Sequence, residues 1–249
     1  MTNERTQERP YLCKIRLADV PVCFCIRFRE AYEYFRPYKD GSVRESVPLA
    51  VTDEDWEYYR EKGITYTGQS EASLLTSYAS DFLMDYDALI MHAAAFTFQG
   101  RAWLITGESG AGKSTQVRNL QDILPGEFRV ICGDRPVLKA ADDGRTFVHP
   151  SPWNGKEGWH GAEAAELAGI ICLERGAENK LETMPLRKAV IPVYNAIIQT
   201  AASEETVLKA AALETKILER VEVYRLESHS VPESSIVLFN GFFRERRTS

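Results

Sequence analysis

Alternation of apolar and polar residues predicts that the first part of the chain is built from short strands and two helices. Strands are expected over residues 12–17, 20–28 and 31–38. Ala18-Asp19, between the first two of these segments, indicates a hairpin turn. Two helices are expected to follow, each with acidic residues near its start: 54–62 after a cap at Thr52 or Asp53, and 71–84 after a cap at Ser70.

From Ala88 onward the apolar runs are longer and indicate buried strands that alternate with helices. Strands are expected over 88–98, 102–106, 128–132, 136–139, 146–149, 167–174 and 221–226. Helical stretches are expected up to Leu120, from a Ser203 cap to Arg220, and from Pro232 onward. The change in pattern predicts a smaller N-terminal α+β part, residues 1–85, packed on an α/β core, residues 86–249.

The composition is that of a globular protein. Of the 249 residues, 44% are hydrophobic and 27% are charged, which excludes a disordered chain, a collagen-like repeat and a coiled-coil rod. The five cysteines include no C-x-x-C pair, so neither a disulfide framework nor a zinc ribbon is expected.

Charge and hydropathy limit the partners of the protein. The formal net charge of −6 argues against a general nucleic-acid or membrane-surface binder. The N-terminus lacks the apolar region of a signal peptide, and no apolar run approaches the roughly 20 residues that span a bilayer. We therefore expect a cytoplasmic protein that binds neither nucleic acid nor membranes. The sequence leaves open whether it forms a homo-oligomer.

The strongest motif is GESGAGKS at Gly107–Ser114, which fits the phosphate-loop pattern G-x-x-x-x-G-K-[ST] at every position. Its glycines let backbone N–H groups turn toward phosphate oxygens. Lys113 can reach the β- and γ-phosphates, and the Ser114 hydroxyl can hold Mg²⁺. ATP and Mg²⁺ are therefore the expected cofactors. The expected nucleotide-binding residues are Gly107, Ser109, Gly110, Ala111, Gly112, Lys113, Ser114 and Thr115.

Three residues outside the loop are candidates for chemistry. Asp134 follows the apolar run RVICG, at a strand end where a carboxylate can coordinate Mg²⁺ or accept a hydroxyl proton. Arg135 beside it is either a phosphate clamp or the surface partner of that carboxylate. His92 lies fifteen residues before Gly107, and by position alone it is more typical of a hydrogen-bonded core histidine than of a catalytic one.

Residues Leu89–Leu173 resemble the nucleotide-binding core of HPr kinase/phosphorylase. The resemblance rests on His92, on the strand-turn-strand leading into GESGAGKST, and on the later sequence GDR. The stretch MHAAAFTFQGRAWLITGESGAGKST is more similar still to stand-alone HPr-kinase-related proteins of modified-peptide clusters. The resemblance implies the α/β phosphate-loop fold that HPr kinase shares with phosphoenolpyruvate carboxykinase.

The resemblance also implies roles for individual residues. Asp134 matches the base that deprotonates the acceptor serine, and His92 matches the histidine that supports this carboxylate. Arg135 matches the arginine of the family's Asp-Asp-Arg sequence, Lys113 the phosphate-binding lysine and Ser114 the metal-site hydroxyl. The implied catalytic set is therefore Asp134, His92, Arg135 and Lys113, and the implied metal ligands are Ser114 and Asp134.

The chain departs from the family at three points. Gly133 stands where the first Asp of the pair belongs, so one carboxylate is missing or is supplied from elsewhere. The downstream E-[IV]-R-G motif and the Pro-Gly-Arg-Asn signature have no counterpart. Because both belong to the bifunctional enzymes, phosphorylase activity and HPr as the substrate are both in doubt.

A second cluster, HPSPWNGKEGWH at residues 149–160, predicts a shaped, exposed loop because it combines prolines, glycines and tryptophans. Lys156 is a candidate to neutralise the γ-phosphate or an acidic acceptor. Trp153 either walls an acceptor pocket or anchors the loop to the body of the protein.

The resemblance implies an ATP-dependent kinase that transfers the γ-phosphate to a serine hydroxyl of a peptide or protein. A product encoded beside this gene is a candidate acceptor. Two alternatives stay open: a kinase for a small hydroxyl compound such as free serine, and a catalytically inactive ATP-binding module, which the loss of a carboxylate at Gly133 would favour.

Overall fold

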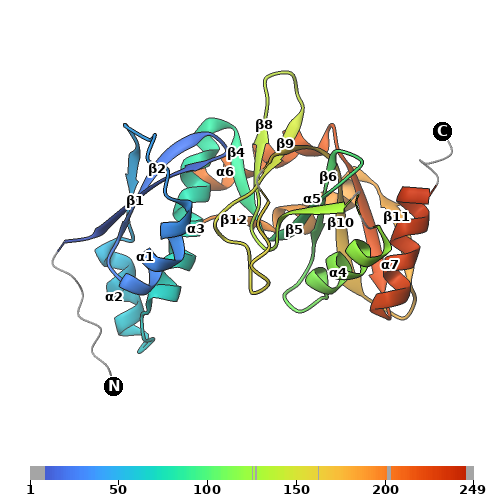
Figure 1. Cartoon of the computed structure of the whole chain (residues 1–249), viewed down its shortest axis with the longest axis horizontal. Helices are drawn as coiled ribbons and strands as arrows, with labels where there is room; N and C mark the ends of the chain where they lie inside the picture. The colour runs from blue at the N-terminus through green and yellow to red at the C-terminus, as the bar shows by residue number, and fades with distance from the viewer. Residues whose placement is uncertain (1–8, 125, 127, 162, 201–202, 245–249) are drawn as a thin grey trace.

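A computed structural model describes residues 9–124, 126, 128–161, 163–200 and 203–244. Within these residues, three strands form a sheet near the N-terminus and ten strands form a second, larger sheet. Figure 1 shows the small sheet at one end of the molecule and the large sheet filling the rest, with helices against both. The mixed α/β architecture expected from the sequence is therefore confirmed.

The small sheet and its helices come from the first part of the chain. Their bounds are β1 (Tyr11–Leu17), β2 (Val20–Ile26), α1 (Arg29–Phe35), the 3₁₀ turn η1 (Arg36–Tyr38), β3 (Val47–Leu49), α2 (Asp53–Glu61), α3 (Gly68–Leu83) and the 3₁₀ turn η2 (Met84–Tyr86). The β1–β2 hairpin is antiparallel, and its turn residues Ala18 and Asp19 have positive φ, so the predicted hairpin is confirmed.

Two predictions in this part need correction. Residues 31–38 are not a strand: they belong to α1 and η1, because Ala31 and Phe35 are buried one helical turn apart on the same face. The second long helix is capped by Thr67 rather than Ser70, since the Thr67 side chain accepts a hydrogen bond from the Ser70 N–H. The Thr52 cap of α2 is confirmed.

The remaining elements build the large sheet and its covering helices. The strands are β4 (Ala88–Met91), β5 (Ala93–Phe98), β6 (Arg101–Thr106), β7 (Phe128–Cys132), β8 (Val137–Ala140), β9 (Thr146–His149), β10 (Ala165–Arg175), β11 (Lys180–Met184), β12 (Ile197–Ile198) and β13 (Glu222–Ser228). The helices are α4 (Lys113–Ile123), α5 (Leu186–Tyr194), α6 (Glu204–Leu218), α7 (Val231–Phe239) and the π-helical turn η3 (Asn240–Arg244).

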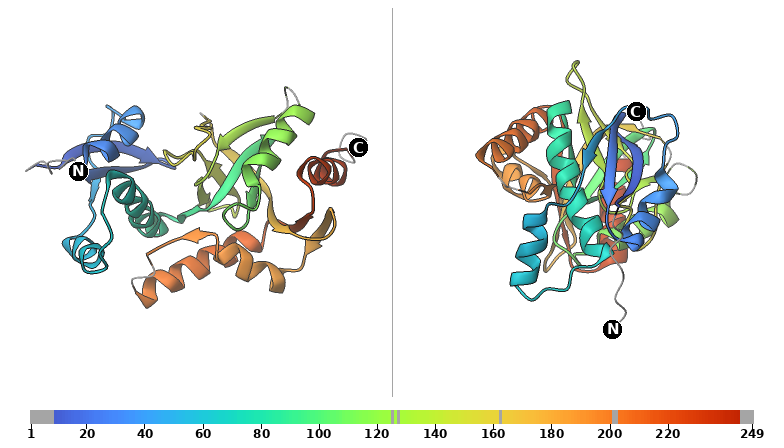
Figure 2. Two further views of the ribbon diagram at one scale, coloured as in Figure 1. Left: turned by 90° about the horizontal axis from the view of Figure 1, so that it is seen from below. Right: turned by 90° about the vertical axis from the view of Figure 1, so that its left-hand side faces the viewer.

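Alternate residues of the central strands face opposite layers of helices. On β6, Trp103 and Ile105 pack against α4 and α7, whereas Ala102 and Leu104 share a core with α5 and α6. Figure 2 shows α4 and the orange α5–α6 pair on opposite sides of the sheet. Strands β6, β10 and β13 are parallel neighbours, which leaves the carboxyl end of β6 and the loop after it at an edge of the core.

A third core joins the N-terminal helices to the loop at residues 149–160. The Trp153 ring packs edge-on against Phe24 and Phe35, and its Nε1 donates a hydrogen bond to the Ala72 carbonyl oxygen at 3.1 Å. Residues 151–154 are buried, so the prediction of an exposed loop is wrong for this part. Trp153 anchors the loop and also lines a cavity beside α3. This core also contains Ile90 of β4, beyond the predicted division at residue 85, which itself stays a prediction.

A buried carboxylate holds α3 to the chain between β2 and α1. Both oxygens of Glu71 accept hydrogen bonds from backbone N–H groups, Arg27 at 2.8 Å and Phe28 at 2.9 Å. Burial raises the pKa of Glu71, whereas these two hydrogen bonds lower it. The contact fixes α3 against the connection between β2 and α1.

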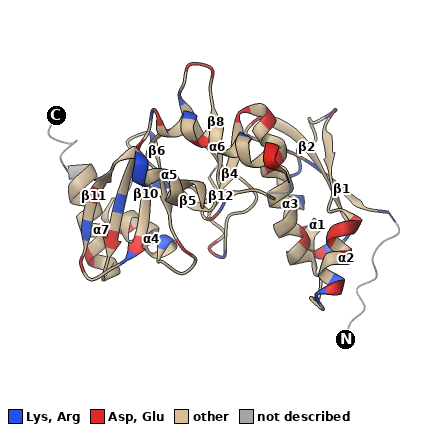
Figure 3. Ribbon diagram, turned by 180° about the vertical axis from the view of Figure 1, so that it is seen from behind, with Lys and Arg blue, Asp and Glu red and all other residues tan. Residues whose placement is uncertain are grey.

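The charged residues of the protein are of both signs, in similar numbers. Acidic and basic residues are interspersed over both parts of the molecule (Figure 3). None of the helices in the described ranges is long and apolar enough to cross a membrane. The predicted cellular location stays a prediction.

One buried acid gives the stability of the protein a pH dependence. Glu214 on α6 is 3% exposed, and its Oε1 has no hydrogen-bond partner within the described residues. Burial raises its pKa from the ordinary 4.5 to about 7, although a hydrogen bond with the Tyr194 backbone opposes the shift. Between these two pH values the folded protein keeps a proton that the unfolded chain has released, so the free energy of unfolding falls as the pH rises.

We therefore expect Glu214→Gln to remove a fall of about 2–3 kcal/mol in the free energy of unfolding between pH 4.5 and pH 7. Urea denaturation at three pH values across this window measures the difference. Glu219→Gln, at the exposed end of the same helix, is the matched control and should follow the wild-type curve. Parallel curves for wild type and Glu214→Gln would contradict the assignment.

Candidate active site

The phosphate loop connects β6 to α4 along the end of β10. Gly107 has φ +151°, and a Cβ at this position would lie 2.4 Å from the Leu173 carbonyl oxygen, so only glycine allows the chain to pass. The helix α4 begins at Lys113, as the motif predicts, and no side chain in the described part of the chain caps its N-terminus at Gly112. An uncapped helix N-terminus presents N–H groups suited to phosphate oxygens.

Lys113 reaches across the loop that it terminates. Its Nζ donates hydrogen bonds to the carbonyl oxygens of Gly107 (2.9 Å) and Glu108 (3.2 Å). Burial lowers the pKa of Lys113, and the charge of Asp134 opposes this effect. The ammonium group therefore lies inside the loop and within electrostatic range of Asp134. Ser114 is half-buried at the start of α4, where its hydroxyl can serve as a metal ligand.

Paired strands bring His92 and Asp134 together from 42 positions apart in the sequence (134 − 92). The predicted strand 88–98 is interrupted at His92: β4 pairs with β8, and β5 pairs with β7. Between these ladders, Ala93 N–H donates to the Asp134 carbonyl oxygen at 2.9 Å. Strands β4 and β5, before and after His92, are therefore in register with β8 and β7, which follow and precede Asp134. This pairing places His92 beside the turn that carries Asp134.

The two side chains lie within hydrogen-bond distance at this point. His92 Nε2 lies 3.3 Å from Asp134 Oδ1, and Arg135 Nε lies 3.2 Å from Asp134 Oδ2. Burial raises the pKa of Asp134, but the hydrogen bond from His92 and the charges of Arg135 and Lys113 outweigh it and hold the pKa below its usual value. Asp134 is therefore a carboxylate at neutral pH, and one of its oxygens is oriented by His92.

Arg135 extends from Asp134 toward the N-terminal helices. Its Nη1 donates a hydrogen bond to Thr76 Oγ1 on α3 at 2.8 Å, and its backbone N–H donates to the Trp153 carbonyl oxygen at 3.0 Å. Of the two roles considered for Arg135, this geometry favours the partner of the carboxylate over the phosphate clamp.

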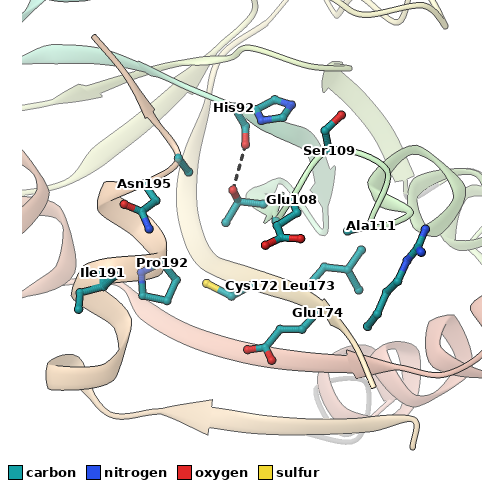
Figure 4. Close-up of a pocket in the computed structure, with 14 residues that line it drawn as sticks. His92, Glu108, Ser109, Ala111, Cys172, Leu173, Glu174, Ile191, Pro192 and Asn195 are labelled. Carbon is teal, nitrogen blue, oxygen red and sulfur yellow. Dashed lines mark hydrogen bonds between the residues drawn. The ribbon is translucent and has the colours of Figure 1, made fainter. Parts of the chain in front are cut away.

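Two residues that the sequence analysis did not single out for this site support it. Thr106, the last residue of β6, donates its hydroxyl to the His92 carbonyl oxygen at 2.9 Å (Figure 4). Arg175, at the end of β10, donates to the Gly110 carbonyl oxygen at 2.7 Å and so holds the tip of the phosphate loop. A polar residue at the end of each of two adjacent parallel strands is the signal that points to them.

Gly133 is buried under the loop at residues 149–160. A Cβ at this position would lie 2.3 Å from the Asn154 carbonyl oxygen and 3.3 Å from its carbonyl carbon. Backbone atoms cannot move aside as a flexible side chain can, so no carboxylate fits at residue 133 while residues 153–155 keep their place. The packing of residues 153–155 over Gly133 therefore excludes the first Asp of the family's Asp-Asp pair.

We expect Gly133→Asp to displace residues 153–155 instead of restoring a second metal ligand. The substitution should lower the free energy of unfolding by about 2 kcal/mol or more, as overpacking does, and should not raise the affinity for Mg²⁺. Thermal unfolding and Mg²⁺ titration measure both effects, and Gly41→Asp is the matched control, because no atom of the described residues lies within 4 Å of a Cβ there and its φ is not positive. A folded Gly133→Asp variant with tighter Mg²⁺ binding would contradict this expectation.

Two cavities lie on either side of the contact between His92 and Asp134. One of about 630 Å³ adjoins the phosphate loop and is lined by His92, Glu108 and Arg175, with Pro192 of α5 opposite (Figure 4). Another of about 850 Å³ lies between α1, α3 and the loop that follows Trp153, and Asp134 lines it. His92 therefore lines the first cavity, and Asp134 lines the second.

The other candidate ligands do not gather into a metal centre. In the described part of the chain, no group of three or more His, Cys, Asp or Glu side chains is placed to hold a metal ion. His160 is exposed and lies edge-on to the Tyr38 ring, and Lys156 lines the larger cavity. Ser114 and Asp134 stay the predicted magnesium ligands.

Comparisons with known proteins find similarity among solved structures. No family model matches the sequence, and no curated protein matches it. Among solved structures, the chain is similar to the HPr(Ser) kinase/phosphatase from Coxiella burnetii, with 16% identity, a TM-score of 0.36, and coverage of 64% of this chain and 99% of that one. A TM-score this low carries no argument about activity, so the functional conclusion has to come from the site geometry.

Proposed function

We propose that this protein is an ATP-dependent kinase that transfers the γ-phosphate of ATP to a serine hydroxyl of a peptide or protein. The observation that carries the proposal is an ionised carboxylate, Asp134, held by His92 within electrostatic range of the lysine of a phosphate loop. The loop provides a site for the triphosphate, and the carboxylate provides a proton acceptor beside it.

In the proposed reaction the serine oxygen attacks the γ-phosphorus, and the bond from that phosphorus to the β,γ-bridging oxygen breaks. The serine proton passes to the Asp134 carboxylate, and ADP leaves. His92 holds Asp134 Oδ1 in position, and Lys113 with the N–H groups of α4 stabilises negative charge on the phosphate oxygens.

Mg²⁺ fits the donor set of the site. Sites for this ion in phosphoryl-transfer enzymes use one or two carboxylates together with water and substrate phosphates, so a single acid does not exclude it. Ser114 and Asp134 are the residues that would hold it. When bound, the ion supplies neutralisation of charge on the triphosphate.

A catalytically inactive ATP-binding module is the second candidate, and Gly133 is the observation that favours it. Incubation of the purified protein with γ-labelled Mg-ATP and candidate acceptors separates the two. Peptides and proteins encoded beside the gene and free serine serve as acceptors, and mass spectrometry locates the phosphate. Nucleotide binding without labelling of any acceptor would support the inactive module and overturn the kinase.

A further inference from the structure

We propose that the 850 Å³ cavity beside Asp134 is the acceptor site, and that it takes a stretch of extended polypeptide with the reacting serine at the Asp134 end. This inference rests on the proposed kinase function. It assigns a role to the N-terminal helices, for which the sequence offered no motif.

The position of the cavity relative to the His92–Asp134 contact supports this assignment first. In phosphoryl transfer the attacking and leaving oxygens lie roughly in line on opposite sides of the phosphorus. His92 lines the cavity that adjoins the phosphate loop at Gly107, Glu108 and Ser109, whereas Asp134 lines the other one. A nucleotide on the loop side therefore leaves the Asp134 side for the acceptor hydroxyl.

A row of hydroxyl groups along α3 is the second argument. Ser70, Ser73 and Ser77 line the cavity, and their spacing of three and four residues places them on one face of the helix. Seven helical residues rise about 10 Å, which matches about three residues of extended chain. Within the described residues, the side chains of Ser73 and Ser77 have no hydrogen-bond partner in the protein, so both hydroxyls are free to bind a ligand.

The hydrogen bond between Arg135 and α3 shows which end of the row of serines lies beside Asp134. Thr76 accepts the hydrogen bond from Arg135, so the Ser77 end lies beside the Asp134 turn and the Ser70 end lies farther along the helix. A serine placed at Asp134 would have its neighbouring residues along α3. Free serine would use only one end of the row and leave most of the cavity to water.

Hydrogen bonds connect the walls of the cavity to each other. The Tyr34 hydroxyl on α1 donates to the Pro152 carbonyl oxygen at 2.9 Å, and Trp153 is hydrogen-bonded to Ala72 of α3. Because these contacts connect both helices to the loop, the site is formed before any ligand binds, as is usual for ligand pockets. Glu30 and Lys156 also line the cavity and add one negative and one positive charge to it.

The test uses the full-length protein, γ-labelled Mg-ATP and two acceptors: a degenerate peptide library with one central serine, and free L-serine. Ser73→Trp fills the cavity from an exposed position on α3, and Ala212→Trp makes the same change at an exposed position on α6 that lines neither cavity. We expect the wild type and Ala212→Trp to label peptides but not free serine. Ser73→Trp should label peptides at least tenfold more slowly and bind ATP with unchanged affinity.

The outcomes separate this inference from the function on which it rests. If Ser73→Trp labels peptides as fast as the wild type, or if free serine is labelled in place of peptides, the acceptor site or class is wrong and the kinase stands. If the wild type labels neither acceptor, the proposed function falls and this inference with it. Ser73→Ala/Ser77→Ala, which keeps the helix, should raise KM for peptides several-fold at unchanged kcat. An unchanged KM would also overturn the site.

Discussion

Asp134→Asn is expected to slow phosphoryl transfer by two or more orders of magnitude while ATP binding stays largely intact. A positioned general base contributes about 10²–10⁴-fold to such reactions. Burial raises the pKa of Asp134, but His92, Arg135 and Lys113 hold it low, so the wild-type side chain is ionised at neutral pH. Asparagine keeps the shape and a hydrogen-bond acceptor for His92, and it removes the group that takes the serine proton.

Single-turnover transfer and equilibrium binding of a non-hydrolysable ATP analogue measure the two quantities separately. Asp122→Asn makes the same chemical change at an exposed position on α4 and should behave as the wild type. The melting temperature shows whether the variant is folded, because Arg135 loses its ionic partner. Full transfer by a folded Asp134→Asn variant would remove Asp134 from the role of base.

Lys113→Ala is expected to weaken ATP binding by about 10- to 100-fold. A hydrogen bond to a charged group contributes about 1.5–3 kcal/mol, and each 1.4 kcal/mol is a factor of ten in affinity. In the structure the Lys113 ammonium donates to two carbonyl oxygens of the loop, and a bound triphosphate offers it stronger, charged acceptors.

Isothermal titration with the ATP analogue and Mg²⁺ measures the affinity. Lys62→Ala, at the exposed end of α2, is the control and should bind as the wild type does. Lys113→Met preserves most of the apolar stem and separates loss of charge from loss of packing. If affinity is unchanged in both Lys113 variants, the phosphate-loop interpretation is wrong.

The sequence predicted correctly those elements that are stabilised by residues close to them in the chain. Strands β7 and β9 lie at the predicted residues because each apolar run is bounded by turn-forming residues. The Thr52 cap was predictable because its partner Asp55 is only three residues away. The strand, loop and helix around Gly107 were predictable because each glycine and the lysine serve the loop itself.

The errors came from residues whose surroundings are distant in sequence. Tyrosine and phenylalanine in residues 31–38 favour strands, yet burial of Ala31 and Phe35 against the N-terminal core selects a helix. The pattern of residues 177–202 predicts no element, although β11, α5 and β12 lie there, because α5 contains Pro192 and exposes Ile191. Trp153 was predicted on an exposed loop because nothing local shows the N-terminal rings that cover it.

The sequence by itself determined the phosphate loop, the helix that it starts, and the residue types available for chemistry. The resemblance implied that His92 supports Asp134, but only the tertiary structure decided how the two side chains meet, since that contact depends on two strand ladders in register on either side. It also decided that Gly133 has no room for a side chain, and that the hydroxyls of α3 lie along the cavity at Asp134. The physical reason is range: backbone propensity acts over a few residues, whereas register and close packing act between segments that folding brings together.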